Sequence, residues 1–400
     1  MKTFLQKCRK PIVIFGASVT CEVVLHWCIE NFIAVAAICD NNTNKQGKKI
    51  CGITVVSPES LALMFPDACI IICVNDIADI VGQLEHLGYK NYIAGGDILR
   101  MVDICNYNYS RPKDFIEYVA ATCILAHENF KHPDRIFIRS VDIVITERCS
   151  LRCRDCSNLM QYYQQPQNYD KESVIGDIDK LCSSCDEINE FRIIGGEPLM
   201  NPQWHEIVSF AIKKNVVHKV IIYTNGTIVA DNEKLQCIAN SKLMWLITDY
   251  GNLSRNIENL CGNLNANGIA FVRTPAANWT DCSSIIYHDR TMDESQRLFN
   301  ACCVKNSFTL MRGNLYRCPF SANADVLQAI PDNQQDRLNV RAKDFNRVKL
   351  GSFLNRNQAI QACDYCSGRP WGAPVIAPAL QYKEKPQYKK FSRGATVAQA

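Results

Sequence analysis

The sequence predicts an α/β protein in which helices cover parallel sheets. Two observations support this fold class. The first hundred residues alternate short apolar segments, such as PIVIFG, AVAAIC and ACIIIC, with amphipathic segments such as TCEVVLHWCIENF. A second alternating series contains VDIVITE, FRIIGG, KVIIYT and LMWLIT. Continuous apolar strands separated by helices are typical of parallel sheets that are buried on both faces.

Length and composition limit the classes of function. A chain of 400 residues is long enough for two or three domains, each with its own core. A hydrophobic share of 47% and a charged share of 21% are those of a globular protein, and a net charge of +4 is too small for a nucleic-acid footprint. No apolar stretch reaches the length of a membrane span. We therefore expect neither a nucleic-acid nor a membrane partner.

The 22 cysteines are the unusual part of the composition. The segment MKTFLQKCRKPIVIFGAS lacks the architecture of a signal peptide, so we expect a cytoplasmic protein with reduced thiols. Cys69, Cys73 and Cys123 lie in apolar runs and are expected to be small core residues. The pair Cys182 and Cys185 shares a helix face and is also expected to pack in the core.

Residues 1–100 are predicted to form a Rossmann-like domain. Its first turn contains Gly16 but lacks the other glycines of the dinucleotide fingerprint, and Asp40 ends the second strand where an acidic residue can hydrogen-bond a ribose. A bound nucleotide and a docking domain without ligand both remain open. The stretch from IFGAS to GITVVSPESL resembles Rossmann-like modules of bacterial enzymes that act on nucleotide sugars and surface polysaccharides.

Residues 101–138 are predicted to be a helical linker, and residues 139–300 a series of βα units. Such units form a barrel or open barrel with its chemistry at the carboxyl ends of the strands. The first of these strands leads into TERCSLRCRDC, which contains Cys149, Cys153 and Cys156. Three thiolates can hold an iron–sulfur cluster and leave one iron open. A structural zinc site needs four ligands, and it gives no reason for the sequence GGEP at residues 195–198.

The C-x3-C-x2-C spacing, followed by Gly195-Gly196-Glu197-Pro198, resembles the radical S-adenosylmethionine (SAM) superfamily. The resemblance implies a partial (β/α)6 barrel and a [4Fe–4S] cluster whose open iron binds SAM. It also implies an electron donor such as flavodoxin or ferredoxin and a 5′-deoxyadenosyl radical that abstracts hydrogen. The glycines would let the backbone approach a ligand, and Glu197 would accept from the SAM ammonium. Asp155 stands where the family usually has an aromatic residue.

Further site residues are predicted at the ends of the later strands. Thr224 and Asn225 close the third strand, where family members contact SAM, so Asn225 is either a ribose ligand or part of a capping turn. Asp249 and Tyr250 end the next strand and are expected to face SAM or substrate. Arg192 lies in an otherwise apolar strand, which is costly unless the side chain reaches a polar interior. We therefore expect Arg192 to point into the barrel and hold a substrate anion.

A second group of cysteines lies in residues 301–375. SFTLM and NLYRC are predicted to form a hairpin around Gly313. The region resembles the auxiliary-cluster segments called SPASM and twitch, and the shorter twitch form with one extra [4Fe–4S] cluster fits better. The resemblance gives four ligands, with Cys302 the alternative for the first: Cys303, Cys318, Cys363 and Cys366. A zinc ribbon is the competing interpretation. Residues 376–400 are expected to be a flexible tail.

A cluster with four protein ligands cannot bind substrate directly, so it is expected to accept or relay an electron. This favours oxidation of a small sugar or nucleotide-linked substrate by a radical SAM oxidoreductase. Three alternatives stay open. They are an enzyme that matures a ribosomally made peptide, a radical SAM epimerase with a cysteine as hydrogen donor, and an iron–sulfur scaffold without enzyme activity.

Overall fold

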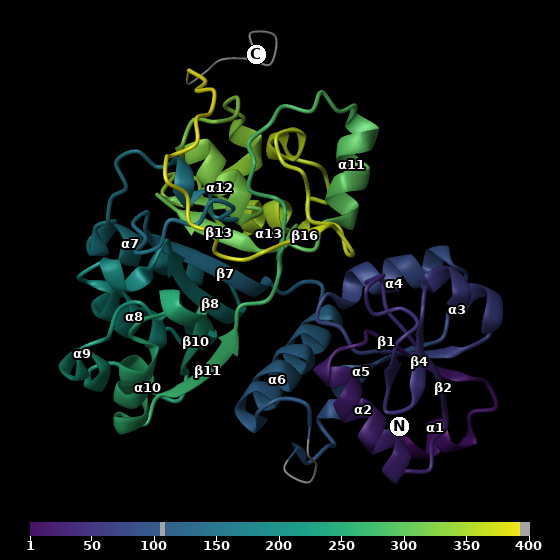
Figure 1. The fold of residues 1–400 in the computed structure, drawn as a ribbon. Coiled ribbons are helices and arrows are strands. Elements are labelled where there is room, and N and C mark those ends of the chain that lie inside the picture. The colour runs from purple at the N-terminus through teal and green to yellow at the C-terminus, as the bar shows by residue number, and fades with distance from the viewer. Residues whose placement is uncertain (105–108, 393–400) are drawn as a thin grey trace. The chain divides into compact units, whose positions relative to one another are not determined.

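The computed structural model describes residues 1–104 and 109–392, and the chain divides into two compact units, Met1–Arg135 and Ile136–Ala400 (Figure 1). The first unit contains a six-stranded sheet. Its strands follow the order β3 (Lys49–Ile50), β4 (Ile53–Val56), β2 (Val35–Cys39), β1 (Ile12–Phe15), β5 (Cys69–Ile72) and β6 (Tyr92–Ala94). All neighbouring pairs are parallel except β3 with β4, which confirms the parallel sheet expected from the apolar runs.

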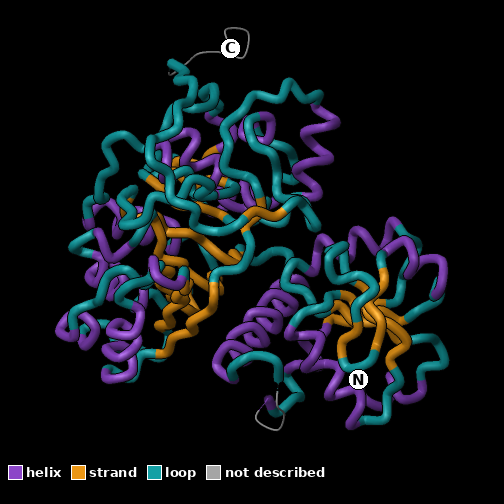
Figure 2. The backbone as a smooth tube through the Cα atoms, in the orientation of Figure 1, coloured by secondary structure: helices purple, strands orange, loops and turns teal. Residues whose placement is uncertain are grey.

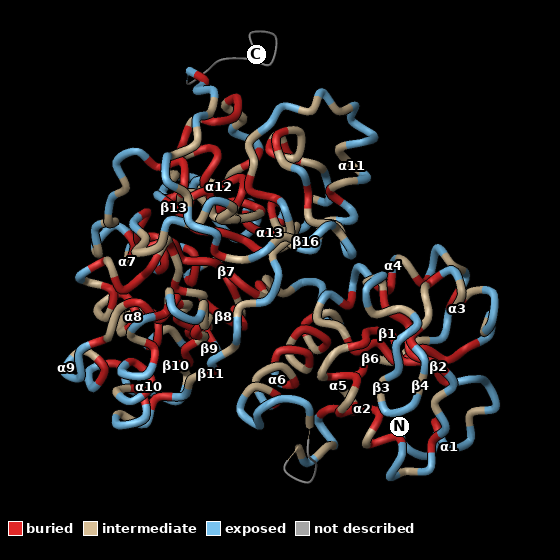
Figure 3. The backbone as a smooth tube through the Cα atoms, viewed as in Figure 1, coloured by how far each residue is buried: buried red, intermediate tan, exposed pale blue. Residues whose placement is uncertain are grey.

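Alternate residues of β1 enter two separate cores, one on each face of this sheet. Figure 2 shows the helices around the strands of this unit, and Figure 3 shows the backbone of β1 coloured as buried. Ile12 and Ile14 belong to the core that is covered by α1 (Lys2–Lys7), α2 (Val19–Glu30), α5 (Gly95–Leu99) and α6 (Lys113–Phe130). Val13 and Phe15 belong to the core that is covered by α3 (Pro58–Met64) and α4 (Ile77–His86). The two-residue side-chain period of a strand explains this division.

Helix α6 is part of the first unit, although the sequence predicts a linker over 101–138. Ile116, Ala120 and Cys123 on one face of α6 are buried in the core with α2 and α5. His127 adds polar contacts, since its Nδ1 accepts from the backbone N–H of Gly96 at 3.0 Å. The helix therefore completes the first unit.

The second unit is built on an eight-stranded sheet. The strands follow the order β11 (Ala270–Pro275), β10 (Leu243–Asp249), β9 (Val217–Thr224), β8 (Glu187–Gly195), β7 (Phe137–Thr146), β13 (Phe308–Met311), β14 (Asn314–Tyr316) and β15 (Arg337–Asn339). Strands β7 to β11 are parallel in chain order, and β13 pairs with β7 in parallel on its other side. The carboxyl ends of these strands consequently meet at one edge, where the sequence motifs lie.

One face of this sheet forms the largest apolar core. The helices that supply side chains to this core are α7 (Lys171–Cys182), α8 (Trp204–Ile212), α9 (Asn232–Gln236), α10 (Ile257–Ala266) and α13 (Arg347–Asn355). Cys182 and Cys185 are buried in it, as expected from the sequence. The remaining elements are α11 (Met292–Ala301), α12 (Pro319–Val326), β12 (Trp279–Thr280), β16 (Val375–Ile376), and the 3-10 turns η2 (Met160–Tyr162), η3 (Pro198–Met200), η4 (Gly251–Leu253), η5 (Gln334–Asp336) and η6 (Gln361–Asp364).

The hairpin predicted around Gly313 is present between β13 and β14. Met311 pairs with Asn314, and both turn residues have positive φ, 50° at Arg312 and 79° at Gly313. Such a two-residue turn matches the right-handed twist of the strands. Within the described part of the chain, no helix is both long and apolar enough to cross a membrane.

Trp245 offers a test of the apolar core of the second unit. It is fully buried on β10 and contacts Trp204 edge to face, with ring centroids 5.6 Å apart. We expect Trp245→Ala to lower the free energy of unfolding by about 3–5 kcal/mol, because it leaves a large cavity. Val348→Ala, at a side chain that is 76% exposed in the same unit, should change it by less than about 0.5 kcal/mol. Denaturant unfolding of both variants measures the difference, and equal midpoints would contradict this packing.

Candidate functional site

The three-cysteine loop begins where β7 ends, and Thr146 fixes its first turn. The Thr146 hydroxyl donates to Asn168 Oδ1 at 2.6 Å and accepts from the backbone N–H of Arg148 at 3.0 Å. The backbone N–H of Glu147 donates to the Gln167 carbonyl at 2.8 Å. The loop therefore leaves the sheet in a defined direction before it reaches the first cysteine.

Cys149, Cys153 and Cys156 line one cavity of about 420 Å³. Burial raises the pKa of all three thiols, and the neighbouring sulfurs raise the pKa of Cys149 and Cys153 further. For Cys153 the pKa reaches about 11. These thiols are thus close enough to influence one another, and metal binding would have to displace their protons.

The donor set fits an iron–sulfur cluster with an open iron. The lining of this cavity contains three cysteines and, among its described residues, no histidine and no fourth cysteine to close a zinc site. No three His, Cys, Asp or Glu side chains in residues 1–104 and 109–392 are placed to hold a single metal ion. Cysteines that ligate a cubic cluster each bind a different iron, so they need not meet at one point.

Gly195 and Gly196 bring the end of β8 against the cysteine loop. A Cβ on Gly195 would lie 2.2 Å from the Thr146 carbonyl oxygen, and one on Gly196 would lie 2.3 Å from the Arg148 carbonyl oxygen and 2.7 Å from Cys149 Cβ. These distances are far inside van der Waals contact. The glycines are therefore required by the chain's own backbone, whereas we predicted that they make room for a ligand.

Glu197 joins the GGEP motif to the end of β9. Its carboxylate accepts from the backbone N–H groups of Leu199 at 3.2 Å and Asn225 at 2.9 Å, and from the Thr224 hydroxyl at 2.9 and 3.0 Å. Burial raises the pKa of Glu197 to about 7, although these hydrogen bonds favour the charged form. The side chain has no exposed surface, so the structure does not support the predicted contact with the SAM ammonium.

Asn225 contacts the cysteine loop. Its Nδ2 donates to Ser150 Oγ at 3.1 Å and to Cys149 Sγ at 3.8 Å, while its Oδ1 accepts from Thr227. The predicted ribose contact would have to compete with all of these partners. Pro198, which follows Glu197, is buried at the start of η3.

The predicted catalytic charges are paired within the protein. Arg192 Nε lies 2.8 Å from Asp142 Oδ1 and 3.7 Å from Glu190 Oε1, on the face of β8 opposite to the core residues Phe191 and Ile193. The Arg192 side chain is 20% exposed and is already paired with carboxylates, so the structure gives it internal partners in place of the predicted substrate anion.

Asp249 is likewise paired, because it accepts two hydrogen bonds from Arg273, at 2.9 and 2.7 Å, and this pairing lowers its pKa. The structure thus gives Asp249 a structural partner in place of SAM or substrate. Tyr250 packs edge to face on Trp279, and burial together with the three cluster cysteines raises its pKa. Of these two residues, only Tyr250 has a pKa that the three cysteines influence, and a contact of Tyr250 with SAM or substrate stays a prediction.

A second cavity, of about 50 Å³, lies among the later cysteines. Its cysteine lining is Cys282, Cys302, Cys318, Cys363 and Cys366. Burial raises the pKa of Cys366, and Cys318, Cys282 and Cys302 raise it further, which places these four sulfurs near one another. Cys318, Cys363 and Cys366 are thus brought together as predicted.

For the predicted first ligand, the position of the side chains favours the runner-up Cys302 over Cys303, and either ligand stays a prediction. Cys303 is exposed and does not line the cavity, whereas Cys302 does. Sequence spacing could not separate two adjacent cysteines, whereas their exposure and the lining of the cavity do. Cys282, which is 3% exposed, was missed because it belongs to no cysteine pair in the sequence.

Backbone N–H groups support the sulfurs of this second set. Cys318 is the residue before α12, and its Sγ accepts from the backbone N–H of Ser321 at 3.4 Å. Cys366 Sγ accepts from the backbone N–H of Gly368 at 3.2 Å. A helix N-terminus and backbone donors stabilise a thiolate, which is the form that binds iron.

The described part of the C-terminal segment, up to residue 392, contacts the rest of the second unit, whereas the sequence predicts a flexible tail over 376–400; residues 393–400 lie outside the described part. Gln381 pairs with Cys153 as an isolated β-bridge. Further along, Lys385 Nζ donates to the Tyr163 carbonyl at 2.5 Å, and Phe391 is buried in the core around the second cysteine set. No local pattern predicts these contacts, because Cys153 and Gln381 are 228 residues apart.

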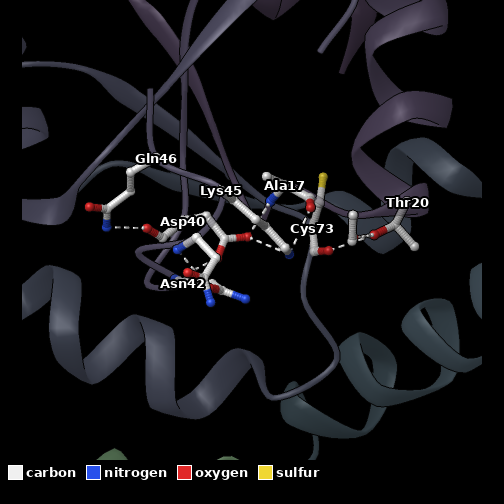
Figure 4. A network of polar contacts seen from close by, with 9 residues as sticks. Ala17, Thr20, Asp40, Asn42, Lys45, Gln46 and Cys73 are labelled. Atoms are coloured by element: carbon white, nitrogen blue, oxygen red, sulfur yellow. Dashed lines mark hydrogen bonds and ion pairs between the residues drawn. The ribbon is translucent and has the colours of Figure 1, made fainter. Parts of the chain in front are cut away.

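In the first unit, the predicted nucleotide residues hold the chain together (Figure 4). Asp40 accepts from the backbone N–H of Ala17 at 2.7 Å, from the backbone N–H of Asn42 at 2.8 Å and from Lys45 Nζ at 3.0 Å. Gly16 has φ 109°, and a Cβ there would lie 2.4 Å from Val74 Cγ1. The structure thus gives Asp40 internal partners in place of the predicted ribose, and a nucleotide in this unit stays a prediction.

Comparison with known proteins agrees with the geometry of the three-cysteine site. Residues 143–249 match the family model of the radical SAM superfamily, and residues 8–93 match the model described as C2185-like, N-terminal. Residues 143–249 are a radical SAM domain, and this family implies a [4Fe–4S] cluster and SAM. The chain is also similar to GTP 3',8-cyclase of Clostridium acetobutylicum, with 34% identity over 101 residues. That match covers 24% of this chain and 31% of the cyclase, so the chain spans about a third of this relative.

Two solved structures overlap with the chain. The crystal structure of BtrN in complex with AdoMet and 2-DOIA has a TM-score of 0.41 and 14% identity, and it covers 60% of this chain and 98% of BtrN. Streptococcus suis SuiB bound to S-adenosylmethionine has a TM-score of 0.29 and 13% identity, and it covers 56% of this chain and 48% of SuiB. Overlaps of this size carry no argument about substrate.

Gly196→Ala tests the contact between β8 and the cysteine loop. We expect the added methyl to displace the loop at Arg148 and Cys149, because the clashing atoms are backbone and Cβ. After anaerobic reconstitution, the variant should bind markedly less iron than the wild type. Gly176→Ala is the matched control, since a Cβ on Gly176 meets nothing within 4 Å. Equal iron loading of both variants would show that the contact is dispensable.

Separate cysteine variants distinguish the ligands of the second set. We expect Cys302→Ala to reduce the iron content from about eight to about four atoms per chain, because one of two [4Fe–4S] clusters loses a ligand. Cys303→Ala should keep about eight. Iron and sulfide analysis of the two reconstituted proteins gives the comparison, and the opposite pattern would restore Cys303 as the ligand.

Proposed function

We propose that the chain is a radical SAM oxidoreductase that dehydrogenates a small hydroxylated or nucleotide-linked sugar. The observation that carries this proposal is the presence of two separate cysteine-lined cavities in one unit, the first lined by three cysteines and the second by five. Three ligands leave an iron free for SAM, whereas four or more close a cluster. A partial (β/α)6 barrel with a twitch-like extension accounts for both cavities.

Cys149, Cys153 and Cys156 would hold a cluster that, together with SAM, would supply a 5′-deoxyadenosyl radical able to remove one hydrogen atom from a substrate carbon. Oxidation of an alcohol is then completed when the carbon radical gives up one electron and the hydroxyl gives up its proton, which leaves a ketone. Cys302, Cys318, Cys363 and Cys366 would hold a closed auxiliary cluster, which would supply a one-electron acceptor. The chain's own task is to bind the substrate, orient it and exclude water.

The interior of the second unit supports a neutral, hydroxylated substrate. Asp142 and Glu190 are 5% and 3% exposed, and Arg192 is the cation paired with them. Arg139 is a further cation near Asp142, so two guanidinium groups already balance the two carboxylates without an anion. An uncharged, hydroxylated substrate would keep this balance, whereas a carboxylic acid would add an unpaired negative charge.

The first unit is proposed to act as a Rossmann-like docking module for the substrate or its carrier. Its five parallel strands follow the order β4, β2, β1, β5, β6. The chain adds strands on one side of β1 up to β4 and on the other side from β5, so the strand order reverses between β1 and β5. Ligands of such sheets bind at this reversal, beyond the carboxyl ends of the strands. The Asp40 contacts described above lie at the end of β2, so a ligand there would meet a preformed surface.

Reconstituted protein with reductant and SAM should release 5′-deoxyadenosine, and Cys153→Ala should abolish this release because the cluster loses a ligand. With substrate present, one oxidised product should form for each 5′-deoxyadenosine. Candidate sugars and nucleotide sugars are first screened by thermal shift. Absence of 5′-deoxyadenosine from fully iron-loaded protein would leave only an iron–sulfur scaffold, and a redox-neutral product would identify an epimerase instead.

A further inference from the structure

The C-terminal segment Ala379–Lys385 crosses the three-cysteine loop and is joined to it by backbone hydrogen bonds. The backbone N–H of Arg154 donates to the Leu380 carbonyl at 2.7 Å, and the backbone N–H of Tyr382 donates to the Arg152 carbonyl at 2.7 Å. Cys153 and Gln381 face each other between these two bonds. The cysteine is thus held on a short two-stranded ribbon whose second strand comes from the far end of the chain.

The Gln381 side chain is directed at the sulfur of Cys153. Its Nε2 lies 3.5 Å from Cys153 Sγ and also donates to the Ala379 carbonyl at 2.8 Å. Its Oε1 accepts from the backbone N–H of Arg152 at 2.7 Å. Both amide hydrogens and the amide oxygen therefore have partners, which fixes the orientation of the N–H that points to sulfur.

The segment is anchored again beyond Gln381, which keeps this geometry in place. Lys385 Nζ donates to the Tyr163 and Gln164 carbonyls at 2.5 and 3.2 Å. The Tyr388 hydroxyl donates to the Leu327 carbonyl at 3.1 Å, and its ring packs edge to face on Tyr162. None of these later contacts involves a cysteine sulfur.

We propose that Gln381 is a positioning residue that raises the reduction potential of the cluster held by Cys149, Cys153 and Cys156. A hydrogen bond to a ligand sulfur stabilises the additional negative charge of the reduced cluster, and such bonds are among the determinants of cluster potential. The proposal rests on the proposed radical SAM function for the presence of the cluster. It adds a residue, from outside the matched domain, that controls how readily the cluster accepts its electron.

Two variants separate the hydrogen bond to sulfur from the other contacts of Gln381. Gln381→Glu keeps an acceptor for Arg152 N–H but loses the amide donor and adds a negative charge. Gln381→Met keeps a similar length and loses both polar groups. We expect the midpoint potential to become more negative in Gln381→Met and more negative still in Gln381→Glu. Tyr388→Phe, which removes one neutral anchor of the same segment, should keep the wild-type potential.

The measurement is a redox titration of the reconstituted protein without SAM, followed by electron paramagnetic resonance, after iron analysis of each variant. If Gln381→Met loads less iron, Gln381→Glu, which retains the backbone acceptor contact, carries the test. Potentials of both Gln381 variants that coincide with wild type and Tyr388→Phe would overturn the proposal. Because the titration needs no turnover, a wild-type protein that fails to cleave SAM would overturn the proposed function without altering this result.

Discussion

The close contact between the end of β8 and the loop after β7 is the constraint on which the candidate site depends. Two consecutive residues without Cβ let the β8 backbone reach the carbonyl groups of Thr146 and Arg148. Glu197 then ties the same turn to the end of β9 through buried hydrogen bonds. An unpaired buried carboxylate or N–H costs free energy. The loop after β7, the end of β8 and the end of β9 therefore stabilise one another. The three cysteines are positioned by strand ends that support one another.

The sequence predicted the layers of the fold and the three-cysteine site, since apolar runs and local spacing carry that information. It predicted less well the partners of charged side chains, which can pair either with a ligand or with another side chain of the protein. Arg192 and Asp249 were expected to meet a ligand, but each has an oppositely charged side chain within 3 Å. A charged residue in an apolar strand indicates a polar interior without saying which partner lies opposite. That partner is set by the register between strands, such as Asp142 with Arg192.

Contacts between distant segments account for the other differences. Residues 376–392 are placed by pairing with the cysteine loop and by packing of Phe391 near the second cysteine set. Neither contact has a local pattern in this Pro- and Lys-rich stretch. Cys282 likewise enters the second cavity from the segment after β12. By contrast, the Cys363 and Cys366 pair is local in sequence and was found. Local motifs were therefore recognised, and long-range ones needed the structure.

The two cysteine sets differ in a way that, under the proposed function, would give them opposite electronic tasks. The first set offers three thiols, and its nearest side-chain donors come from Asn225 and from Gln381, which lies on the exposed C-terminal segment. The second set offers more thiols, with backbone N–H donors on Cys318 and Cys366. An open cluster must bind a small molecule and deliver an electron to it, whereas a closed one can only exchange electrons. A chain with one of each can begin a radical reaction with one electron and remove another at its end, which is the balance that a dehydrogenation requires.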